Sequence, residues 1–144
     1  MSDRSQPIII EQSFNKLKEE VWSAITDPNK MRKWFFENIP DFIPKVGFET
    51  RFNVDAGERQ FMHIWKITEV IPFEKIVYNW RYENMYGNAF VSFELFDGDI
   101  ETLLRLTNLG LETFPQDIPE FSRESCTDGW QYFINKRLKE FLNQ

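Results

Sequence analysis

The sequence predicts an α+β domain with a six-stranded antiparallel sheet, two short helices after the first strand and a longer C-terminal helix. Five segments of alternating apolar and polar residues follow one another with only short turns between them. Connections this short join strands only in antiparallel order. Apolar residues at helical spacing flank this run on both sides. At 144 residues the chain is long enough for one core, and we expect a single domain over residues 1–144.

The first elements are a strand over residues 7–14 and a helix pair over residues 17–36. The first helix places Leu17, Val21 and Ile25 on one side. We expect it to end at Asp27, where the next helix begins. Pro28 fits a first helical turn because its missing N–H is no loss there, and a carboxylate at Asp27 can accept the free backbone donors.

The strands of the sheet are expected at residues 47–54, 61–71, 74–81, 88–96 and 100–109. Turn residues separate them, at 55–57, Pro72, 87–88 and 97–98. Residues 112–120 contain two prolines and are expected to form a loop. The final helix carries one broad apolar stripe, formed by Trp130, Phe133, Ile134, Leu138, Phe141 and Leu142.

Turn lengths predict which side chains share a face of the sheet. A two-residue turn at 97–98 and a four-residue turn at 71–74 set the parity of the four central strands. The C-terminal helix is expected to cover the resulting apolar face. The predicted inward residues are Phe52, Phe61, Trp65, Ile67, Tyr78, Trp80, Val91, Phe93, Leu104 and Leu106, with the polar His63, Glu69, Thr102 and Asn108. A shift of one residue would reverse the faces of any strand.

Composition restricts the classes of partner. The net charge is −6 and the chain has no basic run, which disfavours nucleic acid and anionic membranes as partners. The single cysteine, Cys126, excludes an intrachain disulfide and suits a reducing compartment. The first ten residues lack the apolar run of a secretory signal, and no stretch is long enough for a membrane span. We therefore expect a cytoplasmic protein.

Five segments in order resemble one family. They are EVWSAITDPNKMRKWF at 20–35, VGFETRFNV at 46–54, ITEVIPFEKIVYNW at 67–80, LLRLTNLG at 103–110 and GWQYFINKRL at 129–138. These segments resemble the family named after the activator of heat-shock-protein-90 ATPase, a branch of the SRPBCC or START-like superfamily, and within it the C-terminal-domain-like, stand-alone bacterial members. The resemblance implies a helix-grip fold, in which a curved antiparallel sheet wraps around a long C-terminal helix with a cavity between them.

The chain departs from this family at three informative positions. Asn108 stands where the family usually has His in its L-T-H-x-G strand, and Phe73 replaces a second proline after Pro72. Trp65 takes the place of a common small glycine. If its indole points inward, it would shrink or divide the cavity.

Few residues offer reactive chemistry. His63 is the sole histidine and shows no nucleophile or carboxylate partner, so a surface or cavity-edge histidine without catalysis is favoured. An inward Glu69 would be a desolvated polar anchor, or it would pair with a basic strand residue. Cys126 lies near Glu124 and Asp128, which disfavours a reactive thiolate. No metal-ligand spacing and no phosphate-binding loop is visible, so we predict no metal and no cofactor.

The leading hypothesis is non-enzymatic binding of a small hydrophobic or aromatic ligand between the sheet and the C-terminal helix. The candidate ligand-binding residues are Trp34, Phe52, Trp65, Tyr78, Trp80, Phe93, Leu104, Leu106, Asn108, Trp130, Phe133 and Ile134, with His63 and Glu69 as polar anchors. The alternatives are a stress-related co-chaperone or protein-interaction domain, and an enzyme of the cyclase or hydrolase kind using Glu69, His63 or Tyr78.

The outer face of the sheet is also unusually apolar. Under the predicted register it presents Met62, Ile64, Val77, Phe90 and Phe96. Exposed apolar patches often mark protein contacts, so a chaperone or a second copy of this chain is a candidate partner for this face. The alternative is that the loop at 40–44 covers it.

Overall fold

The computed structural model describes residues 5–143; the first four residues and the last residue of the expected 1–144 domain lie outside it. The strands are β1 Ile8–Phe14, β2 Glu49–Asp55, β3 Gln60–Ile71, β4 Lys75–Tyr82, β5 Ala89–Asp97 and β6 Thr102–Leu109. The helices are α1 Lys18–Thr26, α2 Pro28–Trp34, the short turns η1 Leu111–Thr113 and η2 Pro119–Phe121, and then α3 Arg123–Trp130, the π-helical η3 Gln131–Leu138 and α4 Lys139–Leu142, which follow without a break.

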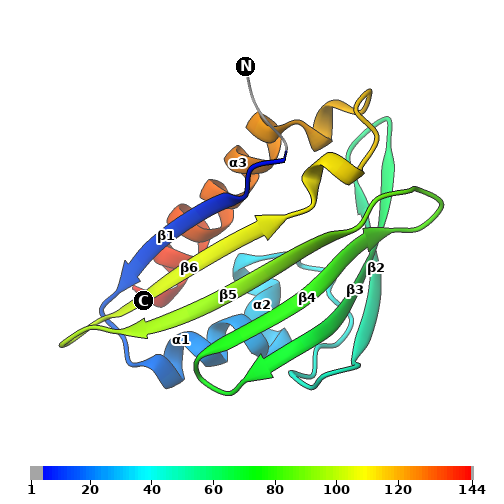
Figure 1. The fold of residues 1–144 in the computed structure, drawn as a ribbon. Helices are drawn as coiled ribbons and strands as arrows, with labels where there is room; N and C mark the ends of the chain where they lie inside the picture. The colour runs from blue at the N-terminus through cyan, green and yellow to red at the C-terminus, as the bar shows by residue number, and fades with distance from the viewer. Residues whose placement is uncertain (1–4, 144) are drawn as a thin grey trace.

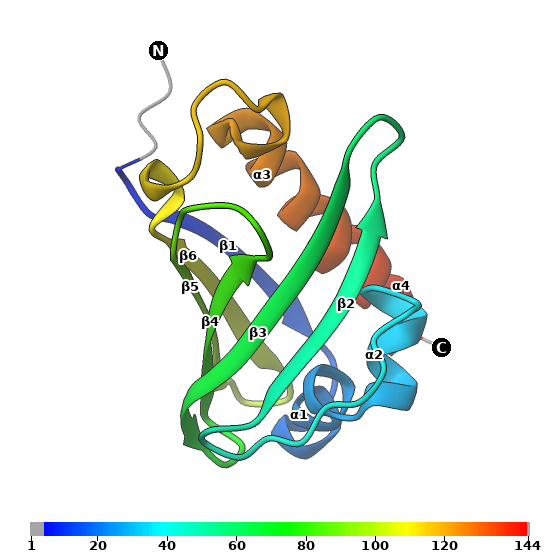
Figure 2. The ribbon, with the colours of Figure 1, turned by 90° about the vertical axis from the view of Figure 1, so that its right-hand side faces the viewer.

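The six strands form one antiparallel sheet in the order β1-β6-β5-β4-β3-β2. The sheet curves, and the helix at 123–142 runs across its inner side, with α1 and α2 at one end (Figures 1 and 2). The predicted α+β class and helix-grip architecture are confirmed. Within residues 5–143, no helix combines the length and the apolar character needed to cross a membrane.

The junction between α1 and α2 forms as the sequence predicts. The side chain of Asp27 accepts a 2.9 Å hydrogen bond from the Asn29 N–H, and Pro28 occupies the first position of α2. Because α1 ends without a connecting loop, the second helix is placed so that the chain after Trp34 enters the inner side of the sheet. There the Trp34 indole donates to the Ala24 carbonyl over 2.7 Å and fastens the two helices together.

The connection between β5 and β6 differs from the prediction, but the predicted faces are correct. The two-residue turn at 97–98 is wrong: Asp97 pairs with Thr102, and residues 98–101 form the loop, closed by a Gly98 N–H bond to the Glu101 carbonyl. This moves the register by an even number of residues, so Phe93 still lies opposite Leu106 on the inner face.

A β-bulge in β3 overturns the prediction for Glu69. Trp65 pairs with Trp80 and Ile67 with Tyr78, as expected, but the next pair is Glu69 with Val77, which leaves one extra residue between them. The bulge turns Glu69 to the outer face, where its half-exposed carboxylate lies 3.8 Å from Lys75 Nζ. The prediction of an inward Glu69 is therefore wrong, and its alternative of a strand ion pair is correct.

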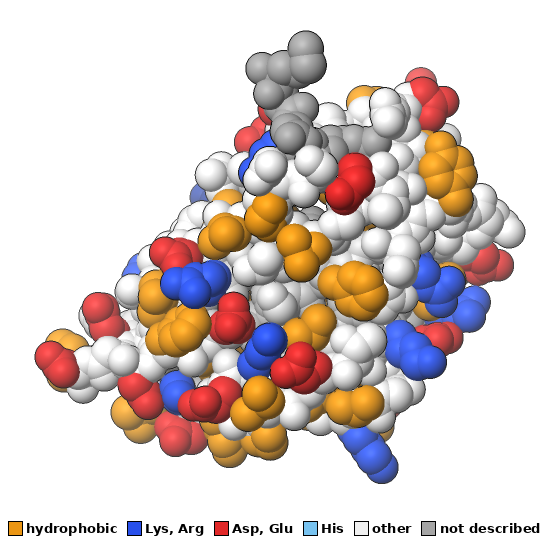
Figure 3. Space-filling view, viewed as in Figure 1, with side chains coloured by type: hydrophobic (Ala, Val, Ile, Leu, Met, Phe, Trp, Pro, Cys, Tyr) orange, Lys and Arg blue, Asp and Glu red, His pale blue; other side chains and the backbone are white. Residues whose placement is uncertain are grey.

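The other predicted inward residues are all buried, including the polar His63, Thr102 and Asn108. On the outer face Ile64 is buried too, whereas Phe90 and Phe96 keep 38% of their surface exposed. The space-filling view of this face shows separate hydrophobic groups among charged side chains (Figure 3). The loop at 40–44 does not cover this face, because the Phe42 ring packs against Trp65 and Tyr78 on the inner side.

Candidate functional site

The inner side of the sheet has two ends of different character, with Trp80 between them. At the end beside α2, aromatic rings fill the space. Trp65 is 1% exposed, and its ring centroid lies 4.7 Å from that of Phe52 and 5.4 Å from that of Phe35. We call this the packed end; it comprises Trp34, Phe35, Phe52, Trp65, Tyr78 and Phe93. Trp65 points inward and occupies the space that a smaller residue would have left.

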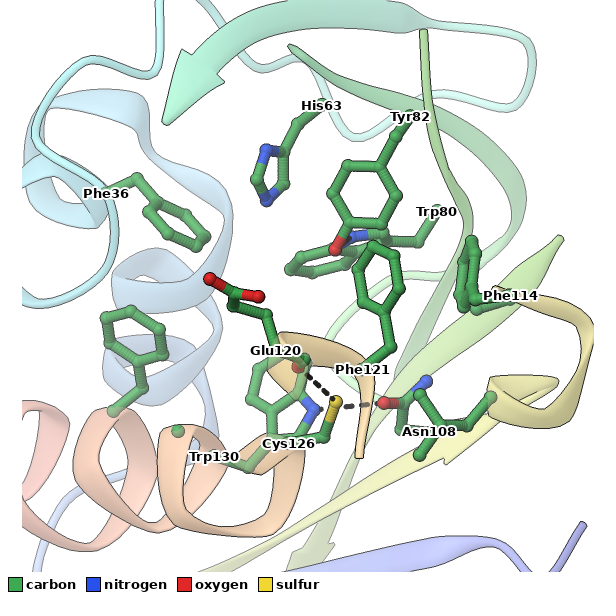
Figure 4. A pocket seen from close by; sticks show the side chains of 14 residues that line it. Phe36, His63, Trp80, Tyr82, Asn108, Phe114, Glu120, Phe121, Cys126 and Trp130 are labelled. Carbon is green, nitrogen blue, oxygen red and sulfur yellow. Dashed lines mark hydrogen bonds between the residues drawn. The ribbon is translucent and has the colours of Figure 1, made fainter. Parts of the chain in front are cut away.

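The other end contains a partly open cavity of about 200 Å³ (Figure 4). We call it the cavity end. Strands β3 to β6 provide one wall, α3 and η3 the opposite wall, and the segment at 111–121 the cover. The lining residues are Phe36, His63, Trp80, Tyr82, Ala89, Asn108, Leu111, Phe114, Glu120, Phe121, Cys126, Gly129, Trp130 and Phe133.

Two glycines shape this end. Gly110 follows β6 with φ +90°, and a Cβ there would lie 2.5 Å from the Asn88 carbonyl oxygen, so only glycine allows the chain to turn into η1 and cross the end of the sheet. Gly129 lies in α3, and a Cβ at this position would meet no atom within 4 Å. The helix therefore presents bare backbone to the cavity where a side chain would otherwise fill it.

His63 supplies a neutral acceptor to the cavity. Its Nδ1 lies 3.0 Å from the Phe61 carbonyl oxygen, and burial lowers the pKa of the ring to about 4. A carbonyl accepts hydrogen bonds only, so Nδ1 carries the proton and Nε2 is left with a lone pair. Figure 4 shows the ring between Phe36 and Tyr82, with its far nitrogen towards the interior of the cavity. Within residues 5–143, no protein group is hydrogen-bonded to Nε2. Nε2 is also not among the buried unpartnered atoms of this part of the chain, so it stays accessible to water through the cavity.

The other polar groups of the lining are partly satisfied. Trp80 Nε1 donates to the Tyr82 hydroxyl over 2.8 Å, and Trp130 Nε1 donates to Asn108 Oδ1 over 3.2 Å. Burial raises the pKa of Tyr82, so this hydroxyl stays protonated at neutral pH. Asn108 stands where the family usually has histidine, and here its amide oxygen accepts from Trp130 and so connects the end of α3 to β6.

An ion pair lies at the rim. Arg59, between β2 and β3, is 3.2 Å from the carboxylate of Glu120, which lies in η2 of the cover segment. The pair joins two segments that are far apart in the sequence. The Cys126 thiol, one helical turn before Trp130, donates to the Glu120 carbonyl over 3.5 Å and fixes the same segment from below.

Apart from Glu69, which lies on the outer face, the predicted site residues separate into two groups. Trp80, Asn108, Trp130, Phe133 and His63 line the cavity. The remainder are in the filled core and do not line it: Trp34, Phe52, Trp65, Tyr78, Phe93, Leu104, Leu106 and Ile134. Sequence reasoning missed the cover segment altogether, although Phe114 and Phe121 in and beside a predicted loop were a usable signal, since large apolar rings are uncommon in solvated loops.

Comparison with solved structures supports the fold. Protein CV1439 from Chromobacterium violaceum superposes with a TM-score of 0.79 at 21% identity, covering 96% of this chain and 97% of its own. The Aha1 dimer from Colwellia psychrerythraea gives a TM-score of 0.73 at 21% identity, with 95% and 96% covered. DynU16, a protein in the dynemicin biosynthetic locus, gives 0.76 at 23% identity; the match covers 99% of this chain and 48% of DynU16.

These identities are low enough that the structural matches establish the fold alone. None of the curated proteins matches the sequence. The family assignment comes from a family model, which matches residues 17–143 and so spans the helix pair, the sheet from β2 onward and the C-terminal helix. The chain therefore belongs to the family of activator of Hsp90 ATPase homolog 1-like proteins.

Proposed function

We propose that this chain binds one small, mainly apolar aromatic molecule in the cavity between the sheet and α3, without a chemical step. The observation that carries this proposal is the partly open cavity of about 200 Å³ among aromatic side chains with only isolated polar groups. An apolar protein cavity of about 150 Å³ is sufficient to take up benzene. The space therefore suits a single-ring compound.

The geometry favours binding over catalysis. The enzymatic alternative uses Glu69, His63 or Tyr78 and needs polar groups that converge on one reacting atom. Glu69 lies on the opposite face of the sheet and Tyr78 in the packed end. His63 is oriented by a main-chain carbonyl instead of a carboxylate, and with a pKa of about 4 it is a weak base at neutral pH.

The similarity to DynU16, a protein in the dynemicin biosynthetic locus, supports a small molecule as the ligand over a chaperone partner. This support is by analogy, because shared fold does not imply shared function. The cavity itself, which is built largely from residues of this chain's own cover segment and helix, supports the proposal independently.

Gly129 offers a direct test. Gly129→Leu should place a side chain in the cavity and abolish binding while the fold is kept, because a Cβ at this position meets no atom within 4 Å. Gly129→Ala is the matched control: it should raise the free energy of unfolding by about 0.5–1 kcal/mol through helix propensity and leave most of the cavity open.

Binding is followed by two-dimensional amide NMR during titration with toluene and p-cresol. We expect shifts to cluster on Trp80, Asn108 and Trp130 in the unmodified protein and in Gly129→Ala, and to be absent in Gly129→Leu. Shifts centred on Phe93 and Leu104, or binding that survives in Gly129→Leu, would contradict the proposal.

A further inference from the structure

We infer that the cavity selects a neutral single-ring aromatic ligand with a hydroxyl group, and that His63 Nε2 accepts the hydrogen bond from that hydroxyl. This inference rests on the proposed function, because it concerns the same cavity. It adds the chemical class of the ligand and the residue that determines specificity.

The tautomer and the orientation of the His63 ring are fixed. Its Nδ1–H is used by the Phe61 carbonyl, and the ring is held between aromatic side chains: it stacks on Phe52 at 5.0 Å and meets the Tyr82 ring at 4.8 Å. The imidazole cannot rotate away without losing these contacts. Its Nε2 lone pair is therefore presented to the cavity in a set direction, as Figure 4 shows.

A ligand without a donor would leave His63 Nε2 without a hydrogen bond. His63 is 4% exposed, and within the described residues no donor reaches Nε2. Nε2 is not among the buried unpartnered atoms of these residues, so water can reach it while the cavity is empty. A ligand that fills the cavity displaces this water, and an acceptor that loses its hydration without gaining a donor costs free energy. A ligand hydroxyl would restore the hydrogen bond, whereas a purely apolar ring would seal the nitrogen off from water.

The charged groups around the cavity favour a neutral ligand. The lining described by the structure includes no lysine or arginine, and Glu120 brings a carboxylate to the rim that already holds the Arg59 guanidinium. An anionic ligand would meet this carboxylate and the His63 lone pair with no cation of its own. Burial of an unpaired charge is strongly unfavourable, so a neutral ligand is favoured over a benzoate-like one.

Three probes of similar size separate these features: p-cresol, toluene and 4-methylbenzoate. We expect p-cresol to bind about tenfold more tightly than toluene at pH 7, which corresponds to one hydrogen bond, and 4-methylbenzoate to bind more weakly than either. In His63→Phe, which keeps an aromatic ring of similar shape, the advantage of p-cresol over toluene should disappear while toluene still binds.

A second readout avoids any question about the folding of the variant. His63 is the sole histidine, so its ring nitrogens are assigned without ambiguity in the ¹⁵N spectrum. Addition of p-cresol should move the Nε2 resonance in the direction of hydrogen-bond acceptance, and toluene should leave it nearly unchanged.

The outcomes separate the two proposals. Equal binding of p-cresol and toluene, an unmoved Nε2 resonance with p-cresol bound, or preferred binding of 4-methylbenzoate would each overturn this inference and leave the proposed function standing. If none of the three probes binds, the proposed function fails, and the inference with it.

Discussion

The packed end and the cavity end use the same kinds of residue on the same face of one sheet. Each has two tryptophans, a tyrosine and several phenylalanines. At the packed end the rings contact one another closely, as in the stacked pair of Trp34 and Phe35, whose centroids are 4.6 Å apart. At the cavity end the rings stand around a space that none of them fills. Aromatic content alone therefore does not reveal whether a helix grip is hollow.

The difference lies in the segment that covers each end. Over the packed end, α2 ends at Trp34, whose ring stacks on that of Phe35, and the Phe35 ring in turn stacks on Trp65. Over the cavity end, the cover is a chain of short turns from 111 to 121, and the helix opposite presents Gly129. A turn segment spans the space and its rings line the margin, while a helix with large side chains fills the space beneath it.

Truncation of Trp65 should make the packed end resemble the cavity end. We expect Trp65→Ala to lower the free energy of unfolding by about 3–5 kcal/mol, because a fully buried indole is replaced by a cavity. Urea denaturation measures this loss. Added indole should then raise the thermal midpoint of the variant and leave that of the unmodified protein nearly unchanged. A loss below about 1.5 kcal/mol would show that the packed end is not tightly filled.

Acid should weaken the cavity end through His63. Its pKa of about 4 in the folded protein lies below the value of 6.5 expected in the unfolded chain. The unfolded state therefore takes up the proton first. The lowered pKa of His63 thus contributes about 3 kcal/mol to the free energy of unfolding. This contribution is fully present above pH 6.5 and is lost as the pH falls towards 4.

Carboxylates also titrate in this range, so the test compares the protein with His63→Phe by urea denaturation from pH 7 to pH 4. The stability of the unmodified protein should fall more steeply than that of the variant. Parallel curves would mean that folding does not lower the pKa of His63, so that the ring takes up a proton as readily in the folded protein as in the unfolded chain.

The sheet and its buried face could be predicted from the sequence, because the alternation of apolar and polar residues along each strand shows which side chains share a face. The wrong prediction of a two-residue turn at 97–98 did not change the predicted faces of β5 and β6, because the register moved by an even number of residues. The extra residue in β3 was different: Ile67, Glu69 and the residues around them continue a plausible strand pattern, so nothing in the sequence marks the bulge that turns Glu69 outward.

The location of the cavity was harder to predict than its existence in the family fold. It depends on how far the Trp65 indole reaches and on where the segment at 111–121 crosses the sheet, and both are properties of three-dimensional packing. Gly129 was visible in the sequence as part of a helix motif. Its consequence, a helix surface without a side chain facing the cavity, follows only when the opposing strands are in place.

Two tyrosines sharpen the comparison with effects of opposite sign. The Tyr78 hydroxyl, in the packed end, is buried without a hydrogen-bond partner among residues 5–143, and burial raises the pKa of the phenol. The Tyr82 hydroxyl, at the cavity end, accepts from Trp80 Nε1. Tyr78→Phe removes only an unsatisfied polar atom, so we expect a gain of about 1 kcal/mol in the free energy of unfolding. Tyr82→Phe leaves the buried indole N–H without its acceptor, so we expect a loss of about 1 kcal/mol.

Tyr86→Phe is the matched control for this pair, because the side chain of Tyr86 is 70% exposed and its substitution should change stability by less than about 0.5 kcal/mol. Urea denaturation of the three variants gives the ordering directly. A destabilising Tyr78→Phe would mean that an ordered water reaches this hydroxyl, and the packed end would then contain polar space. If Tyr78→Phe were destabilising and Tyr82→Phe stabilising, the unfilled volume would lie beside Tyr78 instead of Tyr82. A buried hydroxyl stabilises the fold only where a hydrogen-bond partner, such as a water in a cavity, can reach it.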